Sequence, residues 1–420
     1  MAIACGIDFG TSNTAVTLAM DGEVRPVAVD PLSAIALTIP TLLYFPPSGA
    51  ASYGSEAIER YLASDMAGRL LQSIKRYLPS TTFQGTVVAG KTRSLEELIA
   101  GFLIRCKAAV DAEAGQSVTR VLLGRPAVLH VEPERDAMAQ RRLVTAAKMA
   151  GFEQIEVQLE PIAAARAFER TLDEDLLCLI GDLGGGTSDF TVIRLGPGRV
   201  GRTDRTGDVL GSSGVDIAGN DVDARLIQKR VLPYFGVNCR YRPLKQWVPL
   251  PTFLHMAATR WHRLCVEGAD PENIRFLDRA IRTADDPESL ERFREFLTKN
   301  YGYSLFRAIE AAKVALSAGD STRLVFREGG VQLDEPVSRA QLEADIGDEL
   351  NHLGRCMDGL LQQLGVERSQ IGAVFLTGGT SQIPAVQALF EERFPGRIAS
   401  KEAFTSVGLG LGVEAAERFA

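Results

Sequence analysis

The segment Gly6-Ile7-Asp8-Phe9-Gly10-Thr11-Ser12-Asn13 begins within the apolar run Ile3–Asp8 and is followed by the weakly alternating run Thr14–Leu18. Two such runs separated by a glycine-containing turn are typical of a β-hairpin. We therefore expect a hairpin that turns at residues 10–13 and places Asp8 at the end of its first strand.

This pattern recurs twice further along the chain. Asp182-Leu183-Gly184-Gly185-Gly186-Thr187-Ser188 follows the expected strand Leu176–Asp182, and Thr377-Gly378-Gly379-Thr380-Ser381 follows the expected strand Ile371–Thr377. Chance readily supplies one Gly-Thr-Ser sequence, but not three that each come directly after an apolar strand. The repetition predicts an α/β protein with two similar lobes facing each other across a cleft.

The three turns have the composition of phosphate-binding loops. Glycine lets the backbone approach a phosphate closely, and several N–H groups can then point at it. Carboxylates at the strand ends would repel a bare triphosphate, so Asp8, Asp182 and Asp189 make chemical sense around a Mg²⁺ ion held through water. The alternative is that the turns are ordinary tight hairpins in which each aspartate only bonds its own turn.

Between these turns the periodicity predicts mainly helices. We expect helices over residues 54–78 and 94–114, and a further helix from Pro133 to Ala150 that Gly151 ends. Val118–Pro126 has the composition of a buried strand.

Length and charge narrow the class of protein. A chain of 420 residues is long enough for two lobes, and its net charge of −7 argues against nucleic acid as a partner. The six cysteines are scattered, which is typical of reduced thiols in the cytosol. No signal peptide or membrane span is evident, so we expect a cytoplasmic protein without a membrane partner.

The three turns together resemble the nucleotide motifs of the DnaK-type heat-shock chaperones, the heat-shock protein 70 family. The first two turns resemble its phosphate motifs, and Phe375–Pro384 resembles its adenosine motif. The resemblance spans residues 3–220 and 304–412 and implies the actin-like ATPase fold, with ATP or ADP and Mg²⁺ as ligands and K⁺ as a further candidate ion. It is closest to short, YegD-like relatives that hold only the nucleotide-binding domain.

The resemblance assigns catalytic roles to Lys75, Glu160, Asp182 and Thr187. Lys75 would reach the γ-phosphate and the attacking water, and Glu160 would orient or deprotonate that water. Without the resemblance, Lys75 is a solvated lysine beside Arg76, and Glu160 is a carboxylate near a helix N-terminus.

The adenosine site is implied in the same way. Glu310, Lys313 and Ser317 fall on one face of a helix and would bind ribose and pack on adenine; the alternative is an ordinary Glu–Lys surface pair. Gly378 and Gly379 would complete this site, but Gln382 stands where the family usually stacks an arginine on adenine.

The boundary between the two lobes is expected between residues 178 and 179, with lobe I covering residues 1–178 and lobe II residues 179–420. The outer subdomain of lobe I would cover residues 40–115, and that of lobe II residues 223–315. Residues 236–303 depart from the family pattern and read as an elaboration of the second outer subdomain. A zinc site is the weaker interpretation of this region, because its cysteines and histidines lack the spacing of zinc ligands.

We therefore expect a slow ATPase that works as a chaperone-type molecular switch. The family's peptide-binding domain and lid are not recognised in the sequence, so the output is expected to pass to a protein partner or client through the outer subdomains. The alternatives are a small-molecule kinase with the same fold and an ATP-dependent filament or scaffold protein.

Overall fold

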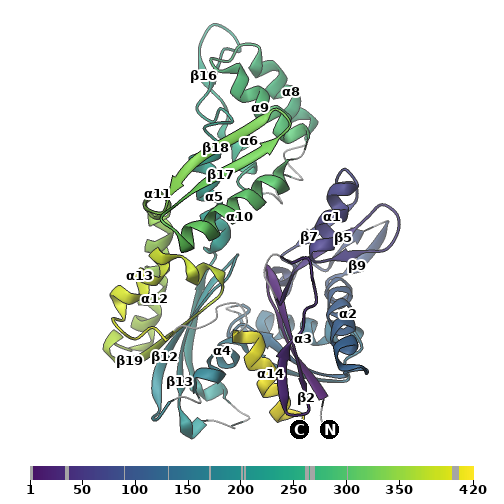
Figure 1. The fold of residues 1–420 in the computed structure, drawn as a ribbon, viewed down its shortest axis with the longest axis vertical. Helices are drawn as coiled ribbons and strands as arrows, with labels where there is room; N and C mark the ends of the chain where they lie inside the picture. The colour runs from purple at the N-terminus through teal and green to yellow at the C-terminus, as the bar shows by residue number, and fades with distance from the viewer. Residues whose placement is uncertain are drawn as a thin grey trace. The chain divides into compact units, whose positions relative to one another are not determined.

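The computed structural model describes residues 3–33, 37–88, 90–130, 132–169, 172–199, 202, 205–260, 264, 270–299, 301–399 and 406–420 (Figure 1). Two compact units contain these residues. Unit 1 comprises Met1–Asp216, Arg355–Ser381 and Phe390–Ala420, and unit 2 comprises Ile217–Gly354 and Gln382–Leu389. This division does not test the lobe boundary at 178/179, which stays a prediction. Within the described ranges no helix is both long and apolar enough to span a bilayer.

The first sheet of unit 1 contains the first glycine turn. Its strand order is β11-β10-β1-β2-β3, and β4 also pairs with β2. β1 is parallel to β10 and antiparallel to β2, and β10 is parallel to β11. The strands are β1 (Ile3–Phe9), β2 (Asn13–Met20), β3 (Glu23–Pro26), β4 (Thr38–Pro40), β10 (Arg120–Arg125) and β11 (Gln154–Leu159). The hairpin expected at residues 10–13 is thus confirmed.

The second sheet of unit 1 contains the other two glycine turns. Its order is β14-β13-β12-β19, with β12 antiparallel to β13 and parallel to β19. The strands are β12 (Leu176–Leu183), β13 (Ser188–Leu195), β14 (Val209–Val215) and β19 (Ile371–Thr377). Because β12 and β19 are parallel, the turns that follow them lie at the same edge of the sheet.

Helices cover both sheets. The longest begins at Ser94, whose hydroxyl accepts from the amide of Glu97 while the Glu97 carboxylate accepts from the amide of Ser94. This capping box fixes the start of the helix. The helices of unit 1 outside its peripheral segments are α2 (Leu95–Ala114), α3 (Pro133–Met149), α4 (Glu160–Glu169), α12 (Gly347–Leu364, which starts in unit 2) and α14 (Ser406–Arg418).

Two hydrophobic cores hold unit 1 together. One lies between the first sheet and α2 and α3. The other contains side chains from α4, α14 and both sheets, including Leu122, Ile180 and Leu411. In Figure 1, α14 (yellow) lies beside β2. The helix and the strand are in direct contact: Thr17 Oγ1 of β2 donates to the carbonyl of Gly408 on α14 at 3.0 Å. The sheets are thereby fixed to each other through packed helices.

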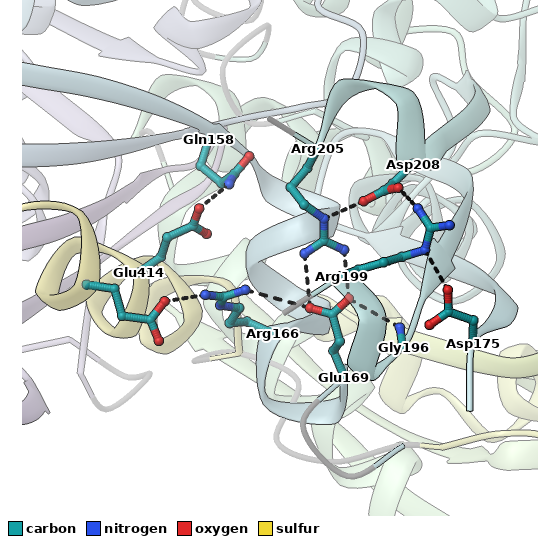
Figure 2. A network of polar contacts seen from close by, with 10 residues as sticks. Gln158, Arg166, Glu169, Asp175, Gly196, Arg199, Arg205, Asp208 and Glu414 are labelled. Atoms are coloured by element: carbon teal, nitrogen blue, oxygen red, sulfur yellow. Dashed lines mark hydrogen bonds and ion pairs between the residues drawn. The ribbon is translucent and has the colours of Figure 1, made fainter. Parts of the chain in front are cut away.

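A buried ionic network fastens the end of α4 to the connection between β13 and β14 (Figure 2). Arg205 Nη2 donates to Glu169 Oε1 at 2.7 Å and Nη1 to Oε2 at 3.0 Å, and both side chains are almost fully buried. Asp208 pairs with Arg199 and Arg205, and Arg166 pairs with Glu417 of α14. The network therefore holds α4, and with it the residue at its N-terminus, Glu160.

In the remaining segments of unit 1, one sequence prediction is wrong. Residues 54–78 were expected to be one helix, but the helix ends at residue 63 and a strand and a short 3₁₀ turn follow. Asp65, Met66 and Gly68 have positive φ values, which no α-helix accommodates. These segments are β5 (Leu42–Phe45), β6 (Ser52–Tyr53), α1 (Ser55–Ala63), β7 (Arg69–Gln72), η1 (Ile74–Tyr77), β8 (Gly85–Val88) and β9 (Lys91–Ser94). The helix over 94–114, the helix after Pro133 and the strand within 118–126 are confirmed.

Unit 2 is mainly helical with two small hairpins. Its elements are α5 (Gly219–Leu226), η4 (Ile227–Val231), β15 (Arg240–Tyr241), β16 (Val248–Pro249), α6 (Thr252–Ala257), α8 (Pro271–Ile281), α9 (Pro287–Thr298), α10 (Gly302–Ala318), β17 (Ser321–Glu328), β18 (Val331–Ser338) and α11 (Arg339–Asp345). α13 (Pro384–Arg393) begins in this unit. His262 and Cys265, which belong to the cysteines and histidines considered for the zinc alternative, lie outside the described residues.

Candidate active site

The carboxyl ends of three parallel strands place two acidic residues together. Ile7 of β1 is in register with Leu123 of β10, so Asp8 lies next to Gly124. Glu160 follows β11 directly and starts α4. A Cβ on Gly124 would lie 3.3 Å from Glu160 Cγ and 3.6 Å from Asp8 Cα. Gly124 therefore provides the space in which the two acidic residues approach each other, a role that the sequence did not suggest.

Lys75 is buried and paired with Glu160. It lies on the short turn η1, and its Nζ donates to Glu160 Oε1 at 2.8 Å. Only 7% of the Lys75 side chain and 8% of the Glu160 side chain are exposed. Lys75 is thus not the solvated lysine of the alternative interpretation. The structure brings together two residues that are far apart in sequence and that were both assigned to catalysis.

The second hairpin contributes two more carboxylates. Asp182 of β12 and Asp189 of β13 are direct partners in the antiparallel register. Thr187 Oγ1 donates to Asp189 Oδ2 at 3.0 Å. The tight turn between the strands is closed by the amide of Gly184, which donates to the carbonyl of Thr187 at 3.0 Å.

The three glycine turns lie next to one another. A Cβ on Gly186 would meet Thr11 Cγ2 at 3.7 Å, so the first and second turns are in contact. Thr380 Oγ1 donates to the carbonyl of Gly184 at 2.6 Å, which joins the third turn to the second. Gly378 has a φ of 82° and no room for a Cβ against the backbone of Leu183. Residues 10–13 and 184–187 are partly exposed.

The acidic side chains around Lys75 repel one another. Burial, and then the charge of Glu160, raises the pKa of Asp8 to about 7 and raises that of Asp182 well above its usual range. Burial also raises the pKa of Asp189 to about 6, although the hydrogen bond from Thr187 opposes the shift. Burial alone would lower the pKa of Lys75, but Glu160, Asp8 and Asp182 raise it. The site therefore has an excess of negative charge around one ammonium group.

The excess charge suits a hard cation. Mg²⁺ prefers oxygen ligands and commonly keeps several of its waters. Within the described ranges no three His, Cys, Asp or Glu side chains are arranged to hold a metal directly. That finding does not test a site in which Asp8, Asp182 and Asp189 hold the ion through water.

The residues expected around adenosine belong to both units. Glu310, Lys313 and Ser317 lie on α10 in unit 2. Gln382, the last residue of η7 (Gly379–Gln382), also belongs to unit 2, whereas Gly378 and Gly379 belong to unit 1. The adenosine site as a whole therefore stays a prediction.

Within unit 2, Lys313 has a partner that the sequence did not suggest. Its Nζ donates to Asp223 Oδ2 at 2.9 Å. Asp223 is buried, and its other oxygen has no hydrogen-bond partner among the described residues. Burial raises the pKa of Asp223, Lys313 opposes this shift and Glu310 adds to it, so Glu310 also acts on this pair.

A family model described as Hsp70 protein matches residues 80–232 and 298–408, more than half of the chain. The chain belongs to the Hsp70 family. It is a chaperone-type ATP-binding protein, and membership implies the actin-like ATPase fold that the sequence predicted. Proteins of this family bind ATP or ADP with Mg²⁺, as well as client proteins. The narrower likeness to YegD-like relatives stays a prediction.

The matched residues cover part of the candidate site. Glu160, Asp182 and Asp189 fall in the first matched segment, whereas Asp8 and Lys75 precede it. For those two residues the geometry is the only support beyond the sequence. Residues 233–297, which contain most of the expected elaboration, lie between the two matched segments.

Proposed function

We propose that this chain hydrolyses ATP slowly and acts as a nucleotide-controlled switch of chaperone type. The observation that carries the proposal is the buried Lys75–Glu160 pair, which lies among Asp8, Asp182 and Asp189 beside three adjoining glycine turns. Phosphoryl transfer to water needs positioning and charge stabilisation more than covalent chemistry, and this arrangement can supply both.

Each part has a distinct task. Amides of residues 10–13 and 185–187 would bind the phosphate oxygens, as backbone N–H groups of glycine-rich turns do. The amide of Gly184 closes the second turn instead. Lys75 would stabilise the charge that develops on the transferred phosphoryl group. Glu160 would hold the attacking water by a hydrogen bond and accept its proton. Thr187, held by Asp189, would position a phosphate oxygen.

A magnesium ion fits the donor set. The carboxylates of Asp8, Asp182 and Asp189 would hold its waters. Burial raises the pKa of all three, and the charge of Glu160 adds to each shift. The ion would supply positive charge to the phosphate oxygens.

The direct test is phosphate release from γ-labelled ATP by the purified chain, with Mg²⁺ or with EDTA. We expect slow Mg²⁺-dependent hydrolysis to ADP that falls at least tenfold in Glu160→Gln. The matched control is Arg76→Ala, because Arg76 is adjacent to Lys75 but exposed and paired with Asp216. Transfer of label to an added hydroxyl compound, with no release to water, would replace the proposal with a kinase.

We further propose a protein partner that binds the β15–β16 hairpin of unit 2. The ring of Trp247 lies 5.8 Å from the guanidinium of Arg240 and 4.4 Å from that of Arg242, and Leu244 is 88% exposed. Among the described residues no carboxylate is within ion-pair distance of Arg242 or Lys245. Exposed tryptophan and arginine are common binding hot spots. The complementary surface is an acidic protein segment with an apolar side chain.

The partner proposal is tested by capturing a binding protein with the chain, purifying that protein, and measuring its affinity for the wild-type chain and for variants. Arg242→Glu and Trp247→Ala should each weaken its affinity at least tenfold, and added salt should weaken binding to the wild type. Phe253→Ser is the control, because Phe253 is also exposed but lies outside the hairpin. Equal affinity of all variants would place the contact elsewhere.

We also propose that the protein is cytoplasmic. The five described cysteines are free thiols, and four of them are buried. Reduced, buried thiols are typical of cytosolic proteins. Recovery of the protein in an oxidising compartment after cell fractionation would contradict this.

A further inference from the structure

Four consecutive carbonyl groups directly after the Lys75 turn accept hydrogen bonds from arginine side chains of α3. Arg142 Nη1 donates to the carbonyls of Tyr77, Leu78 and Ser80 at 3.4, 3.0 and 2.8 Å. Arg135 Nε donates to the carbonyl of Pro79 at 2.9 Å. The carbonyl of Tyr77 also accepts from the amide of Ser80 at 3.0 Å. The carbonyls of Leu78, Pro79 and Ser80 would otherwise depend on water, because a short 3₁₀ turn leaves the carbonyls at its end without backbone partners.

Arg142 is itself held in place. Its Nε lies 3.2 Å from Glu96 Oε1 on α2, and only 11% of its side chain is exposed. Glu96 lies in the first turn of α2, whose start is fixed by the Ser94–Glu97 capping box. One planar guanidinium therefore connects α2 and α3 with the residues that follow Lys75, which suits the fixed fork of donors in arginine.

The Lys75 turn needs an external hold. It has only four residues, and Ser73 immediately before it has a φ of 56°, a left-handed conformation that non-glycine residues rarely adopt. The turn's own backbone bonds are few, such as Leu78 N to Lys75 O at 3.1 Å. Ile74 and Leu78 anchor the turn in the hydrophobic core through their side chains. The arginine bonds add a polar hold on the backbone that follows Lys75.

We propose that Arg142 is a positioning residue for ATP hydrolysis. By holding the carbonyls of Tyr77, Leu78 and Ser80, it keeps the η1 turn in the conformation that places Lys75 Nζ at 2.8 Å from Glu160. Arg142 touches neither reacting atom. This inference rests on the proposed function, because the group that Arg142 positions is the Lys75 ammonium, which is proposed to stabilise the charge that develops on the γ-phosphate. The expected consequence is a loss of turnover without a loss of ADP affinity, since ADP has no γ-phosphate.

The test compares three variants on α3. Arg142→Met removes the donors and keeps the aliphatic stem, and Arg142→Lys restores one donor group. Arg141→Met is the matched control, because Arg141 is adjacent and exposed, and its side chain makes no hydrogen bond or ion pair among the described residues. Single-turnover hydrolysis should fall at least tenfold in Arg142→Met and less in Arg142→Lys, with the ADP dissociation constant within twofold of wild type. Arg141→Met should match wild type.

A merely structural role is separated by two further measurements. In a Lys75→Met background, Arg142→Met should lower the residual rate no further, because both substitutions act through one ammonium group. Hydrogen exchange at the amides of residues 76, 78 and 80 should accelerate in Arg142→Met. If Arg142→Met does not fold, the same measurements are made on Arg142→Lys.

The outcomes distinguish the inference from the proposed function. A wild-type chain that binds ATP and does not hydrolyse it refutes the proposed function and, with it, the role of Arg142. A wild-type chain that hydrolyses ATP while Arg142→Met turns over equally fast refutes only the role of Arg142. Equal additional loss in the Lys75→Met background also refutes it.

Discussion

Asp182 and Asp189 lie directly opposite each other on adjacent antiparallel strands, with the charge of Glu160 acting on both. Like charges at directly opposed positions destabilise a sheet. The free protein keeps this arrangement at a cost in stability, which is expected where carboxylates serve a bound cation rather than the fold. The first prediction uses this conflict between stability and function.

Asp182→Asn should lower ATP turnover and stabilise the nucleotide-free chain against unfolding. Mg²⁺-dependent ATP turnover should fall at least tenfold, because one of the charges that hold the ion is lost. The folded state raises the pKa of Asp182, so its ionisation disfavours folding at pH values above the unfolded pKa of about 3.9. The thermal midpoint in EDTA should therefore exceed that of wild type at pH 8, and the difference should vanish towards pH 4.

The control for this prediction is Asp216→Asn. It removes the same charge from a side chain that is 78% exposed, so neither turnover nor the pH dependence of stability should change much. Unchanged turnover and unchanged Mg²⁺ dependence in Asp182→Asn would remove Asp182 from the metal site.

Lys75→Met should separate nucleotide binding from chemistry. ATP should still bind, as measured by calorimetry, while hydrolysis falls strongly because the lost ammonium acts mainly in the transition state. Removing one partner of a buried pair leaves the other charge uncompensated, so unfolding should become easier by about 3–5 kcal/mol. The double variant Lys75→Met/Glu160→Gln should recover most of that stability and none of the activity. Loss of ATP binding as severe as the loss of turnover would make Lys75 structural.

The local signals of this site were readable from the sequence. Glycine turns after apolar strands depend on a few neighbouring residues, so the hairpin at residues 10–13 could be predicted, and so could the helix over 94–114 from its periodicity. The proximity of Lys75 to Glu160 came only from the family resemblance, because nothing in either segment specifies the distant partner.

Other features depend on tertiary structure and left no sequence signal. Gly124 looks like any strand glycine until the register places it beside Asp8. Arg142 is one of several charged residues on α3 until the chain after Lys75 folds against it. The helix expected over residues 54–78 ends early because Asp65 and Met66 adopt positive φ values, which are uncommon for residues other than glycine and which the apolar periodicity does not indicate.

Gly410→Ala should destabilise unit 1. A Cβ at Gly410 would overlap the backbone carbonyl of Ala163 on α4, which cannot move without shifting the helix that begins at Glu160. Overpacking of this kind costs about 1–3 kcal/mol. The matched control is Gly359→Ala within α12, where a Cβ meets nothing within 4 Å, and helix propensity should add up to about 1 kcal/mol of stability. Denaturant unfolding of both variants measures the difference, and equal effects would contradict the packing of α14 on α4.

Gln382→Arg should tighten ADP binding if residue 382 lies over adenine, as the family resemblance implies. Gln382 is exposed, so a longer side chain can be accommodated without repacking unit 2. A guanidinium stacked on a π system contributes about 0.5–2 kcal/mol, which corresponds to about a twofold to thirtyfold lower dissociation constant. Gln382→Lys is the informative control, because it adds the same charge without a planar group and should give a smaller gain. Calorimetry with ADP measures both variants. An unchanged ADP affinity in Gln382→Arg would mean that adenine does not lie beside residue 382, and the assignment of the third glycine turn to adenosine would then be wrong.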